Sequence, residues 1–428
     1  MSQEIARLEV AGKNYEFEIV EGSEGERGVV IDSLRSETGL ITLDPAYKNT
    51  GSCQSEICFI DGENGILRYR GYPIEELAES SSFLEVAYLL VHGTLPDQKQ
   101  LTEWSEDIKV HTMIHEDLKR LYGAFPKAAH PMAVLSSGVS AMSTFYPEDI
   151  DPEDPEQVSN SIVRLIAKFP TIAAYAHKHS VGQPFLYPDN SMTYVENFLR
   201  MSFGTPCEEY DVNPAIARAI DTLLILHAEH EQNCSTSTVR LVGSSQVNIF
   251  ASISAGIQAL WGPRHGGANQ SVIEMLEAIA DEGLTARQFV DRAKDRDDTS
   301  RLMGFGHRVY RNFDPRARII KKAADDVLEA LGVNTRLLEI AVELEQIALS
   351  DDYFIKRRLY PNVDFYSGII FKALGIPVNS FTCLFAWGRL PGWIAHWLEL
   401  HAEGQAIGRP RQIYTGPAKR PYVKIGSR

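Results

Sequence analysis

The chain has 428 residues, of which 44% are hydrophobic and 23% charged, a composition typical of a globular protein with more than one core. Its formal net charge of −15 argues against nucleic-acid binding as its main role. The same charge repels anionic ligands, so a site for such ligands has to gather arginines of its own.

The first residues lack the basic and apolar regions of a secretory signal. The longest nearly apolar stretch, residues 249–262, is too short and too polar for a membrane span and predicts a buried helix. The five cysteines form no Cys-x-x-Cys pair, which favours reduced thiols. We therefore expect a cytoplasmic protein with no membrane partner.

In chain order, alternating apolar residues between Leu8 and Ile19 predict a hairpin around a Gly-Lys-Asn turn. A mixed segment with Gly and Asp turns follows, up to about residue 70. Apolar residues at three- and four-residue spacing then predict helices. The expected helices cover residues 75–92, 102–120, 214–234, 317–331, 336–349 and 381–401.

These elements predict an all-α fold of two helical domains with a small β-rich N-terminal segment. The β-rich segment covers residues 1–65. A large helical domain is expected to combine residues 66–276 with 382–428, and a small helical domain to cover 277–381.

The segment 260–269 reads LWGPRHGGAN and places His265 just before an expected helix from Gln270. The positive end of a helix dipole disfavours a protonated imidazole. A neutral histidine here suits the donation of a hydrogen bond to an enolate oxygen. The alternative is a histidine that only satisfies loop carbonyls.

The segment 304–318 reads GFGHRVYRNFDPRAR and holds four arginines within eleven residues beside His307. Its glycines allow a close approach of the backbone to a ligand, and arginines grip carboxylates and phosphates bidentately. A solvated basic face is the alternative. The segment has neither the Gly-x-Gly-x-x-Gly spacing of a dinucleotide site nor a phosphate-binding loop.

Asp364 lies in YPNVDFYSG, residues 360–368, at the start of an apolar helix expected from Phe365. One interpretation is an N-cap carboxylate or an acid of the first turn. The other is a general base, flanked by Val363 and Phe365, whose pKa burial brings nearer to the working pH.

His227 and His230 are spaced to share a helix face, so a pair of metal ligands is conceivable. His-Glu-x-x-His is not present and no third ligand is obvious, so we expect no metal. A helical metal-dependent hydrolase is kept as the alternative from another functional class.

Together these segments resemble the citrate synthase family from end to end. Residues 304–316 look like the signature segment of that family, and 227–240, 261–269 and 360–368 match it as well. The β-rich N-terminus is similar to the bacterial branch that forms hexamers built from dimers. The sequence around Cys234 and 388–393 is closest to actinobacterial members.

The resemblance implies condensation of acetyl-CoA with oxaloacetate and water to citrate and CoA, the entry step of the tricarboxylic acid cycle, without a cofactor. It makes Asp364 the base that removes a methyl proton, His265 the group that stabilises the enolate, and His307 the group that polarises the oxaloacetate carbonyl. The substrate-binding residues that it implies are His227, Arg316, Arg389 and Arg409, and Arg311 would meet a CoA phosphate.

The resemblance also implies a homodimer with shared sites, assembling into a homohexamer, in which Arg409 reaches the neighbouring subunit's site. The last 25 residues hold six Lys and Arg and no Asp or Glu, which agrees with a site-forming tail. A solvated terminus is the alternative.

Some members of the hexameric branch are inhibited by NADH at a separate allosteric site. The basic residue that often precedes the first histidine of that site is Val110 here, which leaves inhibition open. The matching positions are His111, Thr112, Met113, Tyr146, Arg164, Lys168 and Cys207.

A near alternative is 2-methylcitrate synthase, which accepts propionyl-CoA. One methylene in an apolar pocket is worth only about 1–3 kcal/mol, so the motifs do not separate the two activities. A non-catalytic, ligand-sensing relative is a further alternative, against which the presence of Asp364, His265 and His307 argues.

Overall fold

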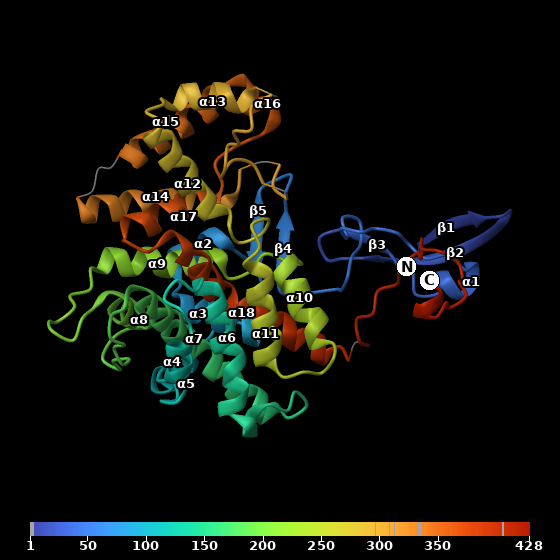
Figure 1. Cartoon of the computed structure of the whole chain (residues 1–428), viewed down its shortest axis with the longest axis horizontal. Helices are drawn as coiled ribbons and strands as arrows, with labels where there is room; N and C mark the ends of the chain where they lie inside the picture. The colour runs from blue at the N-terminus through green and yellow to red at the C-terminus, as the bar shows by residue number, and fades with distance from the viewer. Residues whose placement is uncertain (1–3, 296, 308, 312, 333–335, 405) are drawn as a thin grey trace. The chain divides into compact units, whose positions relative to one another are not determined.

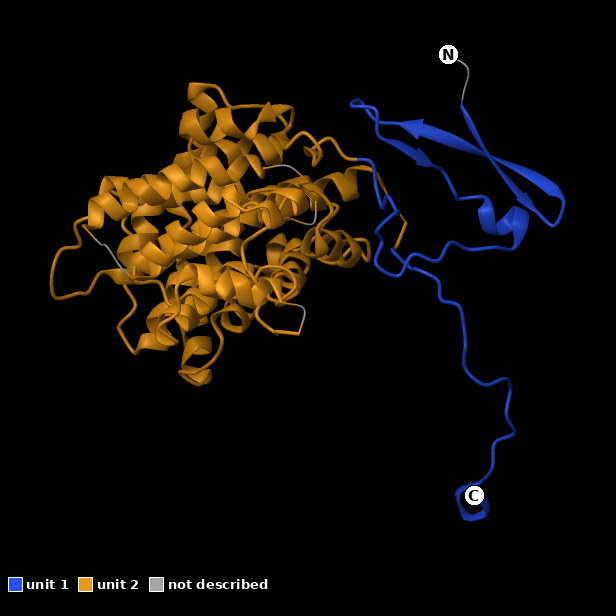
Figure 2. Ribbon diagram, turned by 90° about the horizontal axis from the view of Figure 1, so that it is seen from above, with its two compact units in different colours: residues 1–54, 408–428 blue, residues 55–407 orange. Residues whose placement is uncertain are grey.

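The computed structural model describes residues 4–428 except 296, 308, 312, 333–335 and 405. It divides into two compact units, residues 1–54 with 408–428 and residues 55–407 (Figure 2). The sequence predicts 408–428 to be part of the large helical domain, whereas the structure groups these residues with 1–54. The separation of the helical body into a large and a small domain stays a prediction.

The first unit contains an antiparallel sheet of β1 (Ile5–Val10), β2 (Lys13–Glu21) and β3 (Arg27–Val29). Ala11 and Gly12 join β1 to β2, and both have positive φ, as a tight hairpin turn requires. The predicted hairpin is therefore present, but its turn is Ala11-Gly12 and not Gly-Lys-Asn, because Lys13 and Asn14 already pair with Val10 and Glu9. A short helix, α1 (Leu34–Thr38), follows, and a 3₁₀ turn, η3 (Ile425–Ser427), lies near the C-terminus.

The second unit begins with a small antiparallel sheet, β4 (Cys58–Asp61), β5 (Ile66–Tyr69) and β6 (Tyr72–Pro73), and is otherwise helical (Figure 1). Its helices are α2 (Ile74–Ser80), α3 (Phe83–His92), α4 (Gln98–Val110), α5 (Leu118–Ala124), α6 (Pro131–Phe145), α7 (Pro155–Val181), α8 (Tyr194–Phe203), α9 (Pro214–His227), α10 (Cys234–Gly243), α11 (Ile249–Leu260), α12 (Ala268–Asp281), α13 (Ala286–Lys294), α14 (Pro315–Leu331), α15 (Arg336–Ser350), α16 (Asp352–Arg357), α17 (Val363–Ala373) and α18 (Phe381–Ala402), with 3₁₀ turns η1 (Pro147–Asp149) and η2 (Val378–Ser380).

Three of the predicted helices are wrong in extent. The region expected to form one helix over 75–92 contains two helices, α2 and α3, because Ser82 caps α3 in a reciprocal capping box with Glu85. The helix expected over 102–120 ends at Val110, and a separate α5 follows. The helix expected over 214–234 ends at His227, and α10 starts afresh after the cap Asn233.

The core of the second unit is built around α18, which packs against α3, α9, α10 and α11. Its tryptophans Trp387, Trp393 and Trp397 are all buried. Gly388 lets α18 approach α9 closely, since an added Cβ would lie 3.0 Å from both His227 Cβ and the Leu224 carbonyl oxygen. In the described part of the chain, no helix is long and apolar enough to cross a membrane.

Candidate active site

Two buried arginines meet at the C-terminal end of α9. Arg389, on α18, donates from Nε to the His227 carbonyl at 2.7 Å, and Arg316, on α14, approaches the Leu226 carbonyl at 3.5 Å. Their residues are only 1% and 3% exposed. Carbonyls of a last helical turn attract cations, which explains how the fold holds two guanidinium groups out of water.

Arg316 has a second anchor in Asp314. The carboxylate of Asp314 caps α14 and accepts from the Arg316 backbone N–H at 3.0 Å. The same carboxylate accepts from Arg316 Nε and Nη2, each at 2.9 Å, as a bidentate pair. Burial opposes both charges, yet Asp314 raises the pKa of Arg316 and Arg316 lowers the pKa of Asp314. Arg316 is thus fixed and charged.

The segments around His307 and Asp364 are joined by backbone contacts. Gly306 N–H donates to the Tyr360 carbonyl at 2.7 Å, and Asn362 N–H donates to the Gly304 carbonyl at 2.9 Å. The Asn362 side chain adds a bond of 2.8 Å to the Gly306 carbonyl. Gly304 and Gly306 have φ of 79° and 75°, which side chains disfavour. The fold therefore brings the second and third motifs together.

The protonation of His307 follows from its neighbours. Nδ1 accepts from the N–H groups of Val309 at 3.1 Å and Tyr310 at 3.3 Å, so the proton of the neutral ring is on Nε2. Burial, followed by the charge of Arg316, lowers the pKa of His307 to about 4. His307 is a neutral hydrogen-bond donor through Nε2.

Asp364 lies in the first turn of α17, and the helix is capped by the side chain of Asn362, which accepts from the Asp364 N–H at 3.0 Å. Asp364 is therefore not the N-cap. Burial raises the pKa of its carboxyl to about 6, although Arg316 pulls in the opposite direction. A carboxyl group with this pKa is suited to accept a proton near neutral pH.

His265 lies before α12, whose N-cap is Gly267, and its neutrality has a cause other than the expected helix dipole. Burial, with a smaller contribution from Arg389, lowers its pKa to about 4. Nε2 accepts from the backbone N–H of Ser235 at 3.2 Å and lies 2.9 Å from the Ser235 hydroxyl. The proton of the ring is therefore on Nδ1.

His227 ends α9 and is buried. Its Nδ1–H donates to the Leu223 carbonyl at 2.7 Å, while Nε2 has no partner among the described residues. Burial lowers its pKa to about 3. Its ring packs edge-on against Phe385, which also lies beneath the Arg389 guanidinium, 5.1 Å from the ring centroid. Phe385 is a site residue that our sequence reasoning missed.

His230 is the second residue that sequence reasoning missed, since it was considered only as a metal ligand. It lies in the turn between α9 and α10, not on a helix face. Its ring centroid is 5.2 Å from that of His307 and 5.6 Å from that of Tyr310. Its buried Nε2 lacks a hydrogen-bond partner among the residues that the structure describes, as does Arg389 Nη1. The same residues contain no group of three His, Cys, Asp or Glu able to hold a metal ion.

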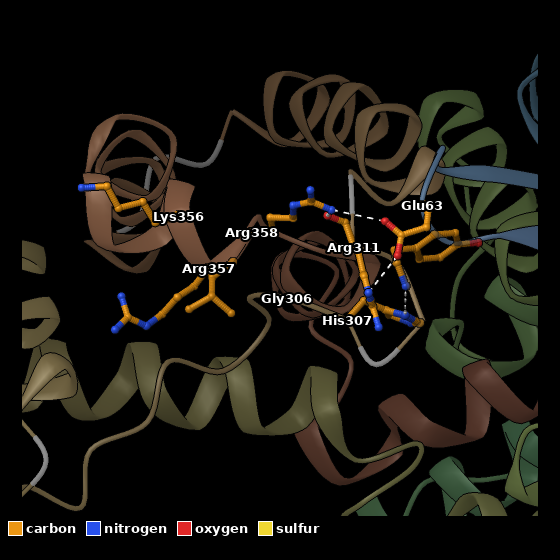
Figure 3. Close-up of a pocket in the computed structure, with 9 residues that line it drawn as sticks. Glu63, Gly306, His307, Arg311, Lys356, Arg357 and Arg358 are labelled. Atoms are coloured by element: carbon orange, nitrogen blue, oxygen red, sulfur yellow. Dashed lines mark hydrogen bonds and ion pairs between the residues drawn. The ribbon is translucent and has the colours of Figure 1, made fainter. Parts of the chain in front are cut away.

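A cationic pocket of about 440 Å³ adjoins His307 (Figure 3). Arg311 lines it, and its role at a CoA phosphate stays a prediction. Glu63, in the turn between β4 and β5, pairs with Arg311 at 3.0 Å and with Arg358 at 3.4 Å. The complete lining is Glu63, Gly306, His307, Tyr310, Arg311, Lys356, Arg357, Arg358 and Leu359.

Arg409 belongs to the first compact unit and is exposed. The other residues expected to contact the substrates all belong to the second unit: His227, His265, His307, Arg311, Arg316, Asp364 and Arg389.

The candidate allosteric residues that follow α4, His111 to Met113, lie beside those on α7. Lys168, on α7, is buried and donates from Nζ to the carbonyls of His111 at 2.5 Å and Met113 at 2.8 Å. Thr112 is tied to the same helix, because its carbonyl accepts from Thr171 at 2.8 Å. Burial, helped by Arg164, lowers the pKa of Lys168 to about 8.

Arg164 extends this cluster along α7. Its guanidinium lies over the Tyr146 ring, 4.2 Å from the centroid, and forms an ion pair with Asp149. Cys207 is exposed in the segment after α8, and among the described residues no hydrogen bond or ion pair joins it to the cluster. Six of the seven expected positions are thus gathered at one place.

Comparison with known proteins places the chain in a class of largely helical acyltransferases. The family model "Citrate synthase, C-terminal domain" matches residues 46–411. Citrate synthase 1 of Mycobacterium tuberculosis is 59% identical over 428 residues, covering 100% of this chain and 99% of the relative. Citrate synthase of Corynebacterium glutamicum is 55% identical, covering 98% and 96% of the two chains.

Solved structures agree with these relatives. Citrate synthase from Pyrobaculum aerophilum superposes with a TM-score of 0.82 at 35% identity, covering all of both chains. Citrate synthase from Thermoplasma acidophilum, solved with carboxymethyl coenzyme A and oxaloacetate, gives 0.80 at 30% identity and covers 90% of this chain and 100% of that one. The chain therefore belongs to the citrate synthase family, and its actinobacterial relatives confirm the resemblance seen in the motifs.

Proposed function

We propose that this chain joins the methyl carbon of acetyl-CoA to the ketone carbon of oxaloacetate and then hydrolyses the thioester, releasing citrate and CoA. One observation carries the assignment of roles. Two half-buried imidazoles, His265 and His307, are neutral and hold their protons on different ring nitrogens, and the carboxyl group of Asp364 has a pKa raised to about 6. This combination suits removal of a proton from a weak carbon acid.

In the first step, the Asp364 carboxylate takes a proton from the thioester methyl group. Negative charge then develops on the thioester oxygen. The Nδ1–H of His265 is the donor that we assign to that oxygen, because Nε2 is engaged by Ser235. A neutral donor whose position is already fixed stabilises the developing enolate without reorganisation during the reaction.

In the second step, the enolate carbon attacks the oxaloacetate ketone. His307 donates from Nε2 to the ketone oxygen, and its fixed tautomer supports this role. We assign the oxaloacetate carboxylates to Arg316, Arg389 and His227, and add His230 on the basis of its unpartnered buried nitrogen. Water then cleaves the citryl thioester. The reaction needs no redox or metal chemistry, so we assign no cofactor besides the substrates.

The pocket beside His307 is our candidate for the CoA phosphates. Arg311, Lys356, Arg357 and Arg358 contribute four positive charges to a protein with a net charge of −15. Such a local excess of cations resolves the electrostatic problem that a strongly acidic enzyme poses to an anionic substrate.

A spectrophotometric assay of CoA release tests the activity. Acetyl-CoA should give thiol release that depends on oxaloacetate, and propionyl-CoA should be the poorer substrate. Faster turnover with propionyl-CoA would replace the proposed activity with 2-methylcitrate synthesis. CoA release that does not depend on oxaloacetate would indicate a hydrolase.

We further propose a homodimer whose sites are shared, with Arg409 completing the partner's oxaloacetate pocket, and assembly of dimers into a homohexamer in the cytoplasm. Its support is the basic tail and the family resemblance. Mixing Asp364→Asn with Arg409→Leu subunits should restore activity, because one site of each heterodimer keeps both residues. Heterodimers without activity, from folded single variants, would place Arg409 in its own chain's site.

The cluster around Lys168 and Arg164 is our candidate for allosteric inhibition by NADH. Arg164 is already paired with Asp149, so a phosphate has to compete with that carboxylate. Inhibition of the wild type by NADH, relieved in Arg164→Gln, would support this assignment. A wild-type enzyme that NADH does not inhibit would contradict this assignment.

A further inference from the structure

The turn between β4 and β5 brings a single negative charge into the cationic pocket. Glu63 Oε1 lies 3.0 Å from Arg311 Nη1, and Oε2 lies 3.4 Å from Arg358 Nη1. Figure 3 shows these two guanidinium groups reaching toward Glu63, while Lys356 and Arg357 point away from it. Glu63 thus forms ion pairs with both arginines that converge in the pocket, Arg311 and Arg358.

The backbone holds this carboxylate in place. Gly62 accepts a hydrogen bond at 2.8 Å from the Arg311 N–H through its carbonyl, and an added Cβ on Gly62 would lie 2.2 Å from the Val309 carbonyl oxygen. Asp61 Oδ1 fixes the turn by accepting from the N–H groups of Glu63 and Asn64, each at 3.0 Å. The Glu63 side chain can therefore rotate away from the arginines, but its backbone remains beside them.

The ion pairs themselves are weak. The side chains of Glu63, Arg311 and Arg358 are 58%, 72% and 56% exposed, and pairs in such high-dielectric surroundings contribute little. A phosphate group carries more charge than a carboxylate and offers more acceptor oxygens to a guanidinium. A phosphate of the ligand can therefore displace Glu63, while the displaced carboxylate stays close enough to repel it.

We propose that Glu63 is a displaceable counter-ion that weakens the hold of this pocket on CoA phosphates. It competes with the ligand for Arg311 and Arg358, limits the affinity for acetyl-CoA, and favours release of the product CoA. The inference rests on the proposed function, because it assumes that the pocket receives CoA.

The test is Glu63→Gln, which keeps an oxygen able to accept from the guanidinium groups and removes only the charge. The KM for acetyl-CoA and the inhibition constant of CoA are both expected to fall about two- to fivefold, and less so at high salt. Glu339→Gln is the matched control, since it removes the charge from a similarly exposed pair with Arg336 on α15 and should change neither constant.

Acetyl-3′-dephospho-CoA identifies the phosphate. The effect of Glu63→Gln should vanish with this substrate if the 3′-phosphate displaces Glu63, and persist if the diphosphate does. An unchanged or higher KM for acetyl-CoA in Glu63→Gln, or an equal fall in the control, would overturn the inference alone. Absence of any oxaloacetate-dependent turnover by the wild type would overturn the proposed function and this inference with it.

Discussion

The backbone N–H of Ser235 donates to Nε2 of His265 across 3.2 Å, and this contact determines where His265 carries its proton. A backbone N–H can donate a hydrogen bond but cannot accept one, so Nε2 has to be unprotonated. Nδ1 therefore carries the proton and is the available donor. The contact comes from the first turn of α10, whose cap Asn233 fixes Ser235 through bonds to its N–H and hydroxyl.

We predict that His265 is a neutral Nδ1–H tautomer between pH 5 and 8. The ¹⁵N chemical shifts of labelled protein, with His265→Gln as the assignment control, measure the tautomer directly. A ring that titrates with a pKa near the ordinary value of about 6.5 would contradict the account. Replacement by alanine should lower kcat by about 10²–10³-fold, as loss of a positioned oxyanion donor does.

The raised pKa of Asp364 predicts opposite effects of pH on activity and stability. Activity requires the carboxylate, so kcat/KM for acetyl-CoA should rise as pH increases through about 6. Folding favours the neutral acid, whose pKa rises from 3.8 to about 6. Its stabilising contribution is complete below the lower value and is lost as pH rises through the upper one.

Asp364→Asn should therefore be more stable than the wild type at pH 8, by up to about 3 kcal/mol, and no more stable near pH 4. Urea unfolding at the two pH values measures the difference. Asp352→Asn, an exposed acid in the first turn of α16, is the control and should show no such gain. A destabilised Asp364→Asn at pH 8 would show that the charged form is the one favoured by folding.

Loss of Asp314 should destabilise the protein strongly. Asp314→Ala leaves the Arg316 guanidinium buried without its carboxylate, and breaking a buried pair in this way costs about 3–5 kcal/mol. Denaturant unfolding should show this loss, whereas Arg336→Gln, which breaks an exposed pair, should stay within about 1 kcal/mol of the wild type. Equal losses of stability in the two variants would contradict the stabilising role of the buried Asp314–Arg316 pair.

We predict that His230 contributes to the binding of oxaloacetate and does not bind a metal ion. If its Nε2 bonds a substrate carboxylate, His230→Ala should raise the KM for oxaloacetate by about 10- to 150-fold, the value of a charge-assisted hydrogen bond. His177→Ala, at a histidine of α7 whose Nδ1 is also buried without a partner among the described residues, should leave that KM unchanged. Restoration of either variant by added divalent metal would contradict this role.

Some features of the fold could be predicted because local patterns suffice for them. The apolar spacing predicted 317–331 and 336–349, which the structure shows as α14 and α15 with nearly the same bounds. The break between α2 and α3 was missed although its signal was present, since Ser82 and Glu85 have the spacing of a capping box.

Other features depend on contacts that spacing does not reveal. The helix expected over 214–234 is interrupted before Glu231, which has a φ of 50°. This conformation is uncommon for a residue other than glycine, so the sequence does not predict it. His230 consequently lies beside His307 instead of on a helix face with His227. The neutrality of His265 was expected from a helix dipole, but burial within the tertiary fold is its main cause.

We assign Asp364 as the base that removes the methyl proton of acetyl-CoA. The most direct test compares kcat with the dissociation constant of oxaloacetate, measured by calorimetry, in wild type and Asp364→Asn. The amide matches the carboxyl in size but cannot accept the proton. We predict a fall in kcat of about 10²–10⁴-fold with an oxaloacetate affinity within about twofold of the wild type. Near wild-type turnover in a variant that binds oxaloacetate normally would contradict the account.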